Sequence, residues 1–563
     1  MKSDQKIYKD IQGIISSKKF DDSLKFIEVN KHKLSELDYW FLLSVNLRYL
    51  KKYKEAIKTL SKVNKINPLY GRAYQEFGHN YSKLNNKDVY CSIFDADDAS
   101  MCGVLKVSTN NFKGKNIYDI LLYLPLAIPV YIMAFTYSDI LSYTGPMQSF
   151  LRNYFPELAV FFNQDYLQIE ILGIIMALAL YPYIYTACRL SFSLVGSNYI
   201  DLSRSLGMSR TKTFYKIVIP LSRVSIFSGL FLVIMEVLNE YGAVKYFGVN
   251  TFTSGIFRSW YSMQDVETAS LLAVFLFFIV VLFFSLERFF NLRYNFHYKP
   301  NTKKFKTESP SNIKKIIIHF TCMLPVLLGF IIPILFIIGN VIYEFERIDF
   351  YKVINLTSNT FIVSLIASSI IIVIAVYFQF LKRIIKNKTL TVFNEAISLT
   401  YALPGAVIGL SLIILFSSFS FKTEVLIGSF AVLIYAYVMR YMAVGISPLK
   451  SSFEKHPASY DDTAVNLGMS PLKLFKSIHL PINKSAIAIA FLITFVDIIK
   501  ELPITLILRP FIFDILAVQT YEYAIEEMIP KSSIYSLTIV MMGVILLIFL
   551  KKIINKEIDV SKS

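Results

Sequence analysis

Four acidic residues stand in apolar stretches of this 563-residue sequence, in two pairs with the same spacing. Glu236 and Glu240 lie in the segment EVLNE, and Asp497 and Glu501 lie in DIIKE. Residues four apart share one face of a helix. Ionisable side chains inside apolar helices are costly and usually face the protein interior or a water-filled path. The spacing therefore predicts two helices whose carboxylates line a translocation path suited to a hard cation, which prefers oxygen ligands.

A structural interpretation of the same acids stays open. They would then lie at the outer membrane interface or form ion pairs with Lys245 and Lys500. Direct metal coordination is the weaker form of the path hypothesis. The four cysteines are far apart, and the six histidines are scattered without an HExxH pattern. Neither a zinc site nor a disulfide framework is predicted, and no nucleophile–base constellation points to an enzyme.

Two loops carry a second repeated pattern, DLSRSLGMS and DTAVNLGMS. In both, an acid precedes a glycine by six residues and a proline follows the glycine by thirteen. We expect a short amphipathic helix with a small residue in it, ended by a glycine that reaches backbone angles closed to other residues. A second short helix then leads to a proline in the first turn of the next span. The matching positions are Asp201 and Asp462, Ser203 and Ala464, Gly207 and Gly468, and Pro220 and Pro481.

The elements that position these residues are membrane helices. Hydrophobic residues make up 54% of the chain and charged residues 18%, with a mean hydropathy of +0.49, whereas soluble domains carry roughly a quarter charged residues. An all-α polytopic membrane protein with about ten transmembrane helices is predicted, each run being near the roughly 20 residues that cross a bilayer. The expected spans are 118–138, 166–187, 224–243, 267–286, 316–340, 360–381, 396–417, 425–445, 484–505 and 533–550. Prolines at 125, 129 and 404 predict kinks.

Basic residues fix the expected orientation. They gather in the connections after spans two, four, six (including Lys382 and Arg383) and eight, whereas Arg152 is the one basic residue between 139 and 165. Cytoplasmic loops are enriched in Lys and Arg, so both termini are expected in the cytoplasm, and the polar, lysine-rich start does not resemble a signal peptide. The net charge of +17 is then explained by topology and contact with membrane lipid rather than by nucleic acid.

Residues 1–92 are expected to form soluble helices with a tetratricopeptide-like spacing. The first repeat would comprise Trp40, Leu43, Ser44, Leu47, Ala56, Leu60 and Pro68, and an incomplete second repeat Tyr74, Phe77, Gly78 and Tyr81. Since at least three repeats usually make a stable solenoid, two interpretations stay open. The segment is either a module that binds a protein partner or a fusion remnant without a separate function.

The duplicated loops resemble the EAA loop of ATP-binding-cassette (ABC) importer permeases, in which Glu-Ala-Ala is followed by three residues, Gly, and later a hydrophobic residue and Pro. Both loops here have Asp for Glu, and the first has Leu202-Ser203 for Ala-Ala. In that family the loop is a coupling helix that docks on the ATPase subunit. Residues 104–550 further resemble the fused two-half permeases of ferric iron importers, in the stretches LPLAIPVYIMAF, SYTGPMQSFLR, EVLNEYGAVKYFGVNTFTSGIFRSWYSM, YALPGAVIGLSL and KELPITLILRPFIFDILAVQTYEYAIEEMI.

This resemblance implies a first permease half at 93–290 without its first two spans, a basic cytoplasmic linker at 291–315 and a second half at 316–563. It implies a bacterial inner-membrane permease, not an enzyme, that moves ferric iron by alternating access. A periplasmic binding protein would meet the outer loops 244–265 and 506–530. The chain has no G-x-x-x-x-G-K-[ST] motif, so no cofactor is expected on it and ATP would bind a dimer of separate ATPase subunits. The alternatives are thiamine, polyamine, molybdate or phosphonate as substrate, a membrane-anchored helical scaffold, or a membrane enzyme that uses the carboxylates.

Overall fold

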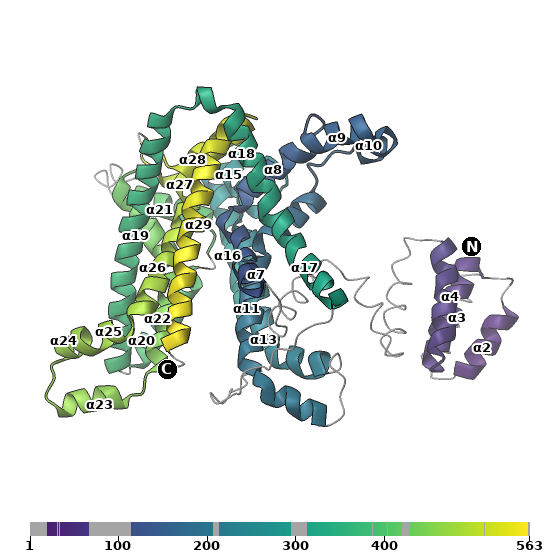
Figure 1. The fold of residues 1–563 in the computed structure, drawn as a ribbon, viewed down its shortest axis with the longest axis horizontal. Helices are drawn as coiled ribbons and strands as arrows, with labels where there is room; N and C mark the ends of the chain where they lie inside the picture. The colour runs from purple at the N-terminus through teal and green to yellow at the C-terminus, as the bar shows by residue number, and fades with distance from the viewer. Residues whose placement is uncertain are drawn as a thin grey trace. The chain divides into compact units, whose positions relative to one another are not determined.

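The computed structural model describes residues 20–66 except 31 and 33, 114–205, 213–293, 312–385, 387–418 except 402, and 428–560 except 512. Every regular element in these ranges is a helix, which confirms the all-α prediction (Figure 1). The chain divides into two compact units, residues 1–101 and 102–563.

The N-terminal unit contains α2 (Phe20–Val29), α3 (Glu36–Tyr49) and α4 (Tyr53–Ile66). Ser35 caps α3 by accepting the Asp38 N–H at 3.1 Å. Helices α3 and α4 pack on one another around Phe41, Leu60 and Val63. The expected first helix pair is therefore present. Pro68 and the second-repeat residues lie outside the described residues, so the tetratricopeptide hypothesis stays a prediction.

The first half of the membrane unit runs from α7 to α16. Its elements are α7 (Lys115–Leu121), η2 (Leu124–Ala127), α8 (Val130–Leu141), α9 (Pro146–Tyr154), α10 (Pro156–Phe162), α11 (Ile169–Ser205), η3 (Phe214–Val218), α13 (Ile219–Asn239), α14 (Gly242–Tyr246), α15 (Phe252–Phe257), η4 (Arg258–Ser262) and α16 (Val266–Arg293).

The second half runs from α17 to α29. Its elements are α17 (Asn312–Val326), η5 (Leu327–Ile331), α18 (Ile332–Tyr343), η6 (Phe345–Arg347), α19 (Phe350–Ile385), α20 (Lys388–Thr400), α21 (Gly405–Ser418), α22 (Phe430–Lys455), α23 (Ser459–Asn466), α24 (Pro471–Leu474), η8 (Phe475–His479), α25 (Leu480–Ile482), α26 (Lys484–Ile499), α27 (Pro503–Leu508), α28 (Leu516–Ile525) and α29 (Ile529–Val560).

Six helices in the described part of the chain are long and apolar enough to cross a membrane, or up to nine if each bent pair counts as one span. The expected span 118–138 is one such pair, bent by 90° between residues 127 and 130, where Pro125 and Pro129 interrupt the helix. The expected span 396–417 falls on α20 and α21, whose apolar part, Gly405–Ser417, is short. The prediction of about ten spans thus compares with six to nine among the described residues, because three helix pairs that could cross are bent by more than 40°.

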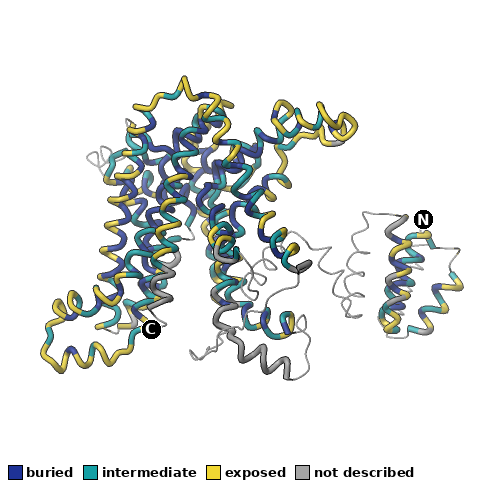
Figure 2. Tube along the Cα trace, in the orientation of Figure 1, coloured by how far each residue is buried: buried dark blue, intermediate teal, exposed yellow. Residues whose placement is uncertain are grey.

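The apolar surface of the helices is divided between core and lipid. Only 22% of the most apolar part of Val266–Phe289 is buried, against 56% for Phe430–Lys455. Figure 2 shows this division as buried and exposed positions alternating along the helices. Because lipid tails are as apolar as leucine, exposed Phe275 and Phe278 on α16 are expected where bilayer replaces water.

The two halves repeat one packing arrangement. Helix α11 packs on α13 as α22 packs on α26, and α8 contacts α14 as α21 contacts α27. The halves also interlock, since α16 contacts α21, and α29 contacts η2. Buried residues of both halves share one core that includes Ala127, Leu276, Ala406 and Ile539, and the second half has a further core around α19, α22 and α26. A polar site enclosed between the halves is therefore held by helices from both.

Candidate translocation cavity and coupling loops

A cavity of about 90 Å³ lies where the two halves meet, and all four carboxylates singled out by the sequence line it. Glu236 is on α13 and Glu240 directly follows that helix, while Asp497 is on α26 and Glu501 follows it. The structure thus brings together residues more than 250 positions apart. Other polar side chains around the cavity are Tyr183, Asn239, Tyr401, Arg440, Tyr441 and Lys500.

Glu501 is the most enclosed of the four acids, with 4% of its surface exposed. Its Oε1 accepts from Arg440 Nη1 at 3.3 Å and from the Ile504 N–H at 2.9 Å, and its Oε2 accepts from the Tyr441 hydroxyl at 2.5 Å. Asp497 pairs with Lys500 at 3.2 Å, as the structural interpretation of the sequence had it for Lys500. These contacts tie the Glu501 side chain to α22 and to the start of α27.

Glu240 and Glu501 perform the same local task in the two halves. Glu240 Oε1 accepts the Ala243 N–H at 3.0 Å, at the start of α14, as Glu501 accepts the Ile504 N–H at the start of α27. The first N–H groups of a helix have no partner within the helix, and a side-chain oxygen that accepts from one of them stabilises the helix start. Both glutamates therefore hold the break between a membrane span and the short helix after it.

Three contacts cross the cavity from one half to the other. The Tyr401 hydroxyl donates to Glu236, and the Gly405 N–H donates to Asn239 Oδ1 at 2.8 Å. Lys500 Nζ donates to the Leu126 carbonyl oxygen at 3.3 Å. The described geometry is therefore one in which the halves are joined through their polar residues.

Two polar atoms at the cavity have no hydrogen-bond partner, the Tyr131 hydroxyl and Arg440 Nε. Both residues are at most 4% exposed. A cavity of this size holds several water molecules, so these atoms mark where water or a passing polar ligand would bind. No group of three or more His, Cys, Asp or Glu side chains among the described residues is arranged to hold a metal ion. Four of the eight carboxylate oxygens at the cavity accept a protein hydrogen bond, and Asp497 Oδ1 is paired with Lys500.

The second coupling loop is described in full. Asp462 is exposed on α23, and Ala464 is buried against Phe380, Phe453 and Leu474. Gly468 has φ +72°, a left-handed conformation that favours glycine. The Gly468 N–H donates to the Val465 carbonyl at 2.9 Å and the Met469 N–H to the Ala464 carbonyl at 3.0 Å, the pattern of a Schellman helix end.

The loop then turns back toward the membrane. Pro481 lies in the short helix α25, and the chain bends by 71° between residues 482 and 484, where α26 begins. The predicted order of helix, glycine, helix and proline is therefore observed here, but Pro481 lies in α25, before the bend, and not in the first turn of α26 as expected.

The first coupling loop is described only at its two ends. Asp201 and Ser203 belong to the last turns of α11, which runs without a break from Ile169 to Ser205. The separate short helix expected there is wrong for the first loop, because nothing interrupts α11 before residue 205. Pro220 lies in the first turn of α13. Gly207 lies outside the described residues.

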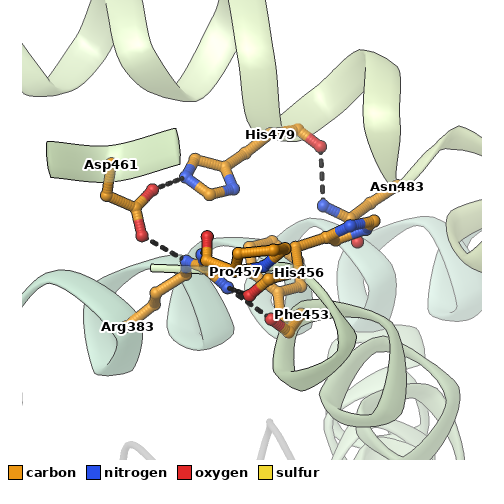
Figure 3. Close-up of polar contacts among 7 residues, drawn as sticks. All are labelled: Arg383, Phe453, His456, Pro457, Asp461, His479 and Asn483. Carbon is orange, nitrogen blue, oxygen red and sulfur yellow. Dashed lines mark hydrogen bonds and ion pairs between the residues drawn. The ribbon is translucent and has the colours of Figure 1, made fainter. Parts of the chain in front are cut away.

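Sequence reasoning missed a polar network at the second loop (Figure 3). Arg383, at the end of α19, donates through Nε to Asp461 Oδ2 at 2.6 Å, and its other nitrogens donate to backbone carbonyls of residues 453, 456 and 457. His479 Nε2 hydrogen-bonds Asp461 Oδ1 at 2.7 Å. Burial lowers the pKa of His479 against the opposing effect of Asp461. The sequence showed Arg383 only as one more cytoplasmic basic residue.

The described residues thus form two repeated sets of apolar helices around a shared polar cavity, with a helix–glycine–helix loop after α22. Residues 99–295 match the family described as "Binding-protein-dependent transport system inner membrane component". This match and the relatives below support an ABC-type importer permease, a class of membrane transport proteins rather than enzymes.

Among its relatives is the Fe(3+)-transport system permease protein FbpB 2 of Haemophilus influenzae. The two are 26% identical over 447 residues, which cover 78% of this chain and 83% of the relative. The sulfate transport system permease proteins CysT of Salmonella typhimurium and of Escherichia coli are also 26% identical, over 141 residues that cover 25% of this chain and 48% of theirs.

Proposed function

We propose that the chain is the permease of a ferric iron importer in the bacterial inner membrane, with both termini in the cytoplasm. The observation that carries the choice of iron is the extent of similarity. The match to an Fe(3+) permease spans both halves, 447 residues, whereas the matches to sulfate permeases span 141.

The charge of the cavity supports a cation. Four carboxyl side chains line it, against two basic ones, Arg440 and Lys500. In a site with low-dielectric walls, charge of one sign attracts the opposite sign and repels its own. A dianion such as sulfate would meet an excess of acidic groups, whereas a cation would meet oxygen atoms, including the unpartnered Tyr131 hydroxyl. The Glu236 side chain is our candidate for contact with a passing ion, since Glu240 and Glu501 cap helices.

The mechanism follows from the contacts between the halves. The bonds from Tyr401 to Glu236 and from Gly405 to Asn239 join the halves across the cavity, so both have to break when the halves rock apart. Separate ATPase subunits would drive that change through the loops at Gly207 and Gly468, and a periplasmic binding protein would deliver the substrate to the outer side. Ferric iron is the cargo in this scheme and passes through as substrate.

The test is uptake of radioactive ferric iron by cells that lack their own iron permease and supply the matching ATPase and binding protein. The parent chain is compared with a Gly207→Pro, Gly468→Pro double variant at equal membrane levels, and radioactive sulfate is measured in parallel. The proposal is supported if the parent chain takes up iron and the double variant does not. Sulfate uptake without iron uptake would replace iron by sulfate, and no uptake of either would favour the scaffold hypothesis.

A further inference from the structure

The second coupling loop begins at a helix end that its own backbone cannot complete. Helix α22 ends at Lys455, and Pro457 follows two residues later. In a continuous helix the N–H of residue 457 would donate to the carbonyl of Phe453, but proline has no N–H. Arg383 supplies the missing donor, since its Nη1 donates to the Phe453 carbonyl. The same Nη1 donates to the His456 carbonyl at 3.1 Å, and Nη2 to the Pro457 carbonyl at 2.9 Å.

The Arg383 guanidinium also holds the coupling helix itself. Its Nε donates to Asp461 on α23, and the two side chains are 13% and 19% exposed. Asp461 in turn binds His479, which precedes the turn into α26. His479 is enclosed between Phe453, stacked at 5.5 Å between ring centroids, and Phe380. Arg383 thus connects α19, the end of α22 and α23, and Asp461 extends the connection to His479 before the next span, as Figure 3 shows.

The first loop has a different composition at the matching positions, which lie 261 residues earlier (207 and 468, 220 and 481). Ile200 stands in the place of Asp461, Val218 in the place of His479, and Gly196 in the place of Pro457. Gly196 keeps its N–H, and α11 continues through this point as one helix. Helix α19 also has no counterpart among the described helices of the first half. Among the residues that the structure describes, the polar anchor is therefore found at the second loop.

We propose that Arg383 is a positioning residue for ATP coupling, and that it makes the second loop a rigid connection to its ATPase subunit by a means that the first loop does not share. The motion of the nucleotide-binding subunit then reaches α19 and α22 through the Arg383 guanidinium, and the start of α26 through Asp461 and His479. This inference rests on the proposed importer function, but not on iron as the substrate.

The first readout concerns the loop alone and needs no substrate. A nitroxide label is placed on Val465→Cys, a position 62% exposed on α23, in a background with the four native cysteines replaced. We expect Arg383→Ala to increase the mobility of the label and Arg383→Lys to have a smaller effect, because lysine keeps the charge but lacks the fork of donors. Lys382→Ala is the matched control. It removes the neighbouring cation and its 3.5 Å pair with Glu454 on α22 but leaves the carbonyl contacts intact, so the label should not change.

The second readout is the amount of substrate transported per ATP hydrolysed, in proteoliposomes with the ATPase and binding protein. We expect Arg383→Ala to lower this ratio by about tenfold, because a charge-assisted hydrogen bond is worth roughly that factor in an equilibrium, and Lys382→Ala to preserve it. If Arg383→Ala gives less folded protein but leaves the amount of substrate transported per ATP unchanged, Arg383 has a structural role only and the proposal is overturned. A label that stays immobile in Arg383→Ala would overturn it as well. If the parent transports no iron but the label mobilities are as expected, the result contradicts iron as the substrate and leaves the role of Arg383 in place.

Discussion

Gly468 offers the sharpest test of the coupling geometry, because a substitution there changes the backbone and almost nothing else. Its φ is +72°, and a Cβ built on it would meet no heavy atom within 4 Å. The cost of Gly468→Ala is therefore the intrinsic cost of the left-handed conformation in a residue with a Cβ, about 1–2 kcal/mol. That energy corresponds to a roughly 5- to 30-fold change in an equilibrium constant.

The expected consequence is weaker binding of the ATPase subunit. If the subunit binds only the observed loop conformation, its apparent affinity falls with the fraction of permease in that conformation, up to the 5- to 30-fold limit. Gly468→Asn should lie between glycine and alanine, since asparagine tolerates this region better than other residues with a side chain. Gly468→Pro should be the most severe, because φ is fixed near −65° and the hydrogen bond to the Val465 carbonyl is lost.

The assay is equilibrium binding of the purified ATPase subunit to permease in lipid nanodiscs. The matched control is Gly173→Ala on α11, where a Cβ also meets nothing within 4 Å and φ is not positive; it should bind like the parent. Equal affinity for Gly468→Ala and the parent, with both variants folded, would refute the requirement for a left-handed residue. The order Gly, Asn, Ala, Pro is the signature that a general loss of stability would not reproduce.

Three further outcomes are expected. Gly405→Ala should lower the free energy of unfolding by about 1–3 kcal/mol, because its Cβ would lie 2.2 Å from a guanidinium nitrogen and 2.9 Å from the Glu501 carboxylate. The measurement is thermal unfolding in detergent. The control Gly339→Ala, whose Cβ would meet nothing within 4 Å, should be as stable as the parent. Glu501→Gln should destabilise the fold by about 3–5 kcal/mol, since it leaves its buried arginine partner uncompensated, whereas Glu236→Gln should fold and alter uptake; equal thermal stabilities would contradict this difference. Burial lowers the pKa of His479 below its usual 6.5. Its contribution to loop stability is therefore present above pH 6.5 and is lost as the pH falls through the lower pKa of the folded state. The mobility of the label on α23 should rise on acidification, and a mobility that does not change down to pH 5 would contradict this.

The membrane architecture was predictable because its signals are local. An apolar run of about 20 residues needs no knowledge of its neighbours, and the prolines at 125 and 129 mark the 90° break in their own segment. The duplicated loops were found in the same way, from the spacing of acid, glycine and proline within one loop. The helix expected around Asp201 failed for the opposite reason: nothing in the pattern DLSRSLGMS indicates that α11 already extends through it.

The partners of the site residues were not predictable by spacing. Glu236 meets Tyr401 from 165 positions away, and Asp461 meets Arg383 from 78 positions away. Helical periodicity relates only residues a few positions apart, so it predicted which side chains would face inward but not which would meet. One local signal was available and not used: in both halves the acid lies three residues before an N–H at the start of the next short helix, which is the spacing of a capping side chain.

That signal changes how the carboxylates divide their roles. Equivalent positions in two repeated halves invite the same function for all four acids, yet Glu240 and Glu501 are bound to backbone N–H groups of α14 and α27, and Asp497 is paired with Lys500. Glu236 is instead bound across the cavity, by a tyrosine from the other half. A bond between halves has to break whenever they separate, whereas a cap within one half does not. In the transport mechanism that we propose, Glu236 is therefore the acid whose partner changes, and it, rather than the buried Glu501, would receive an ion.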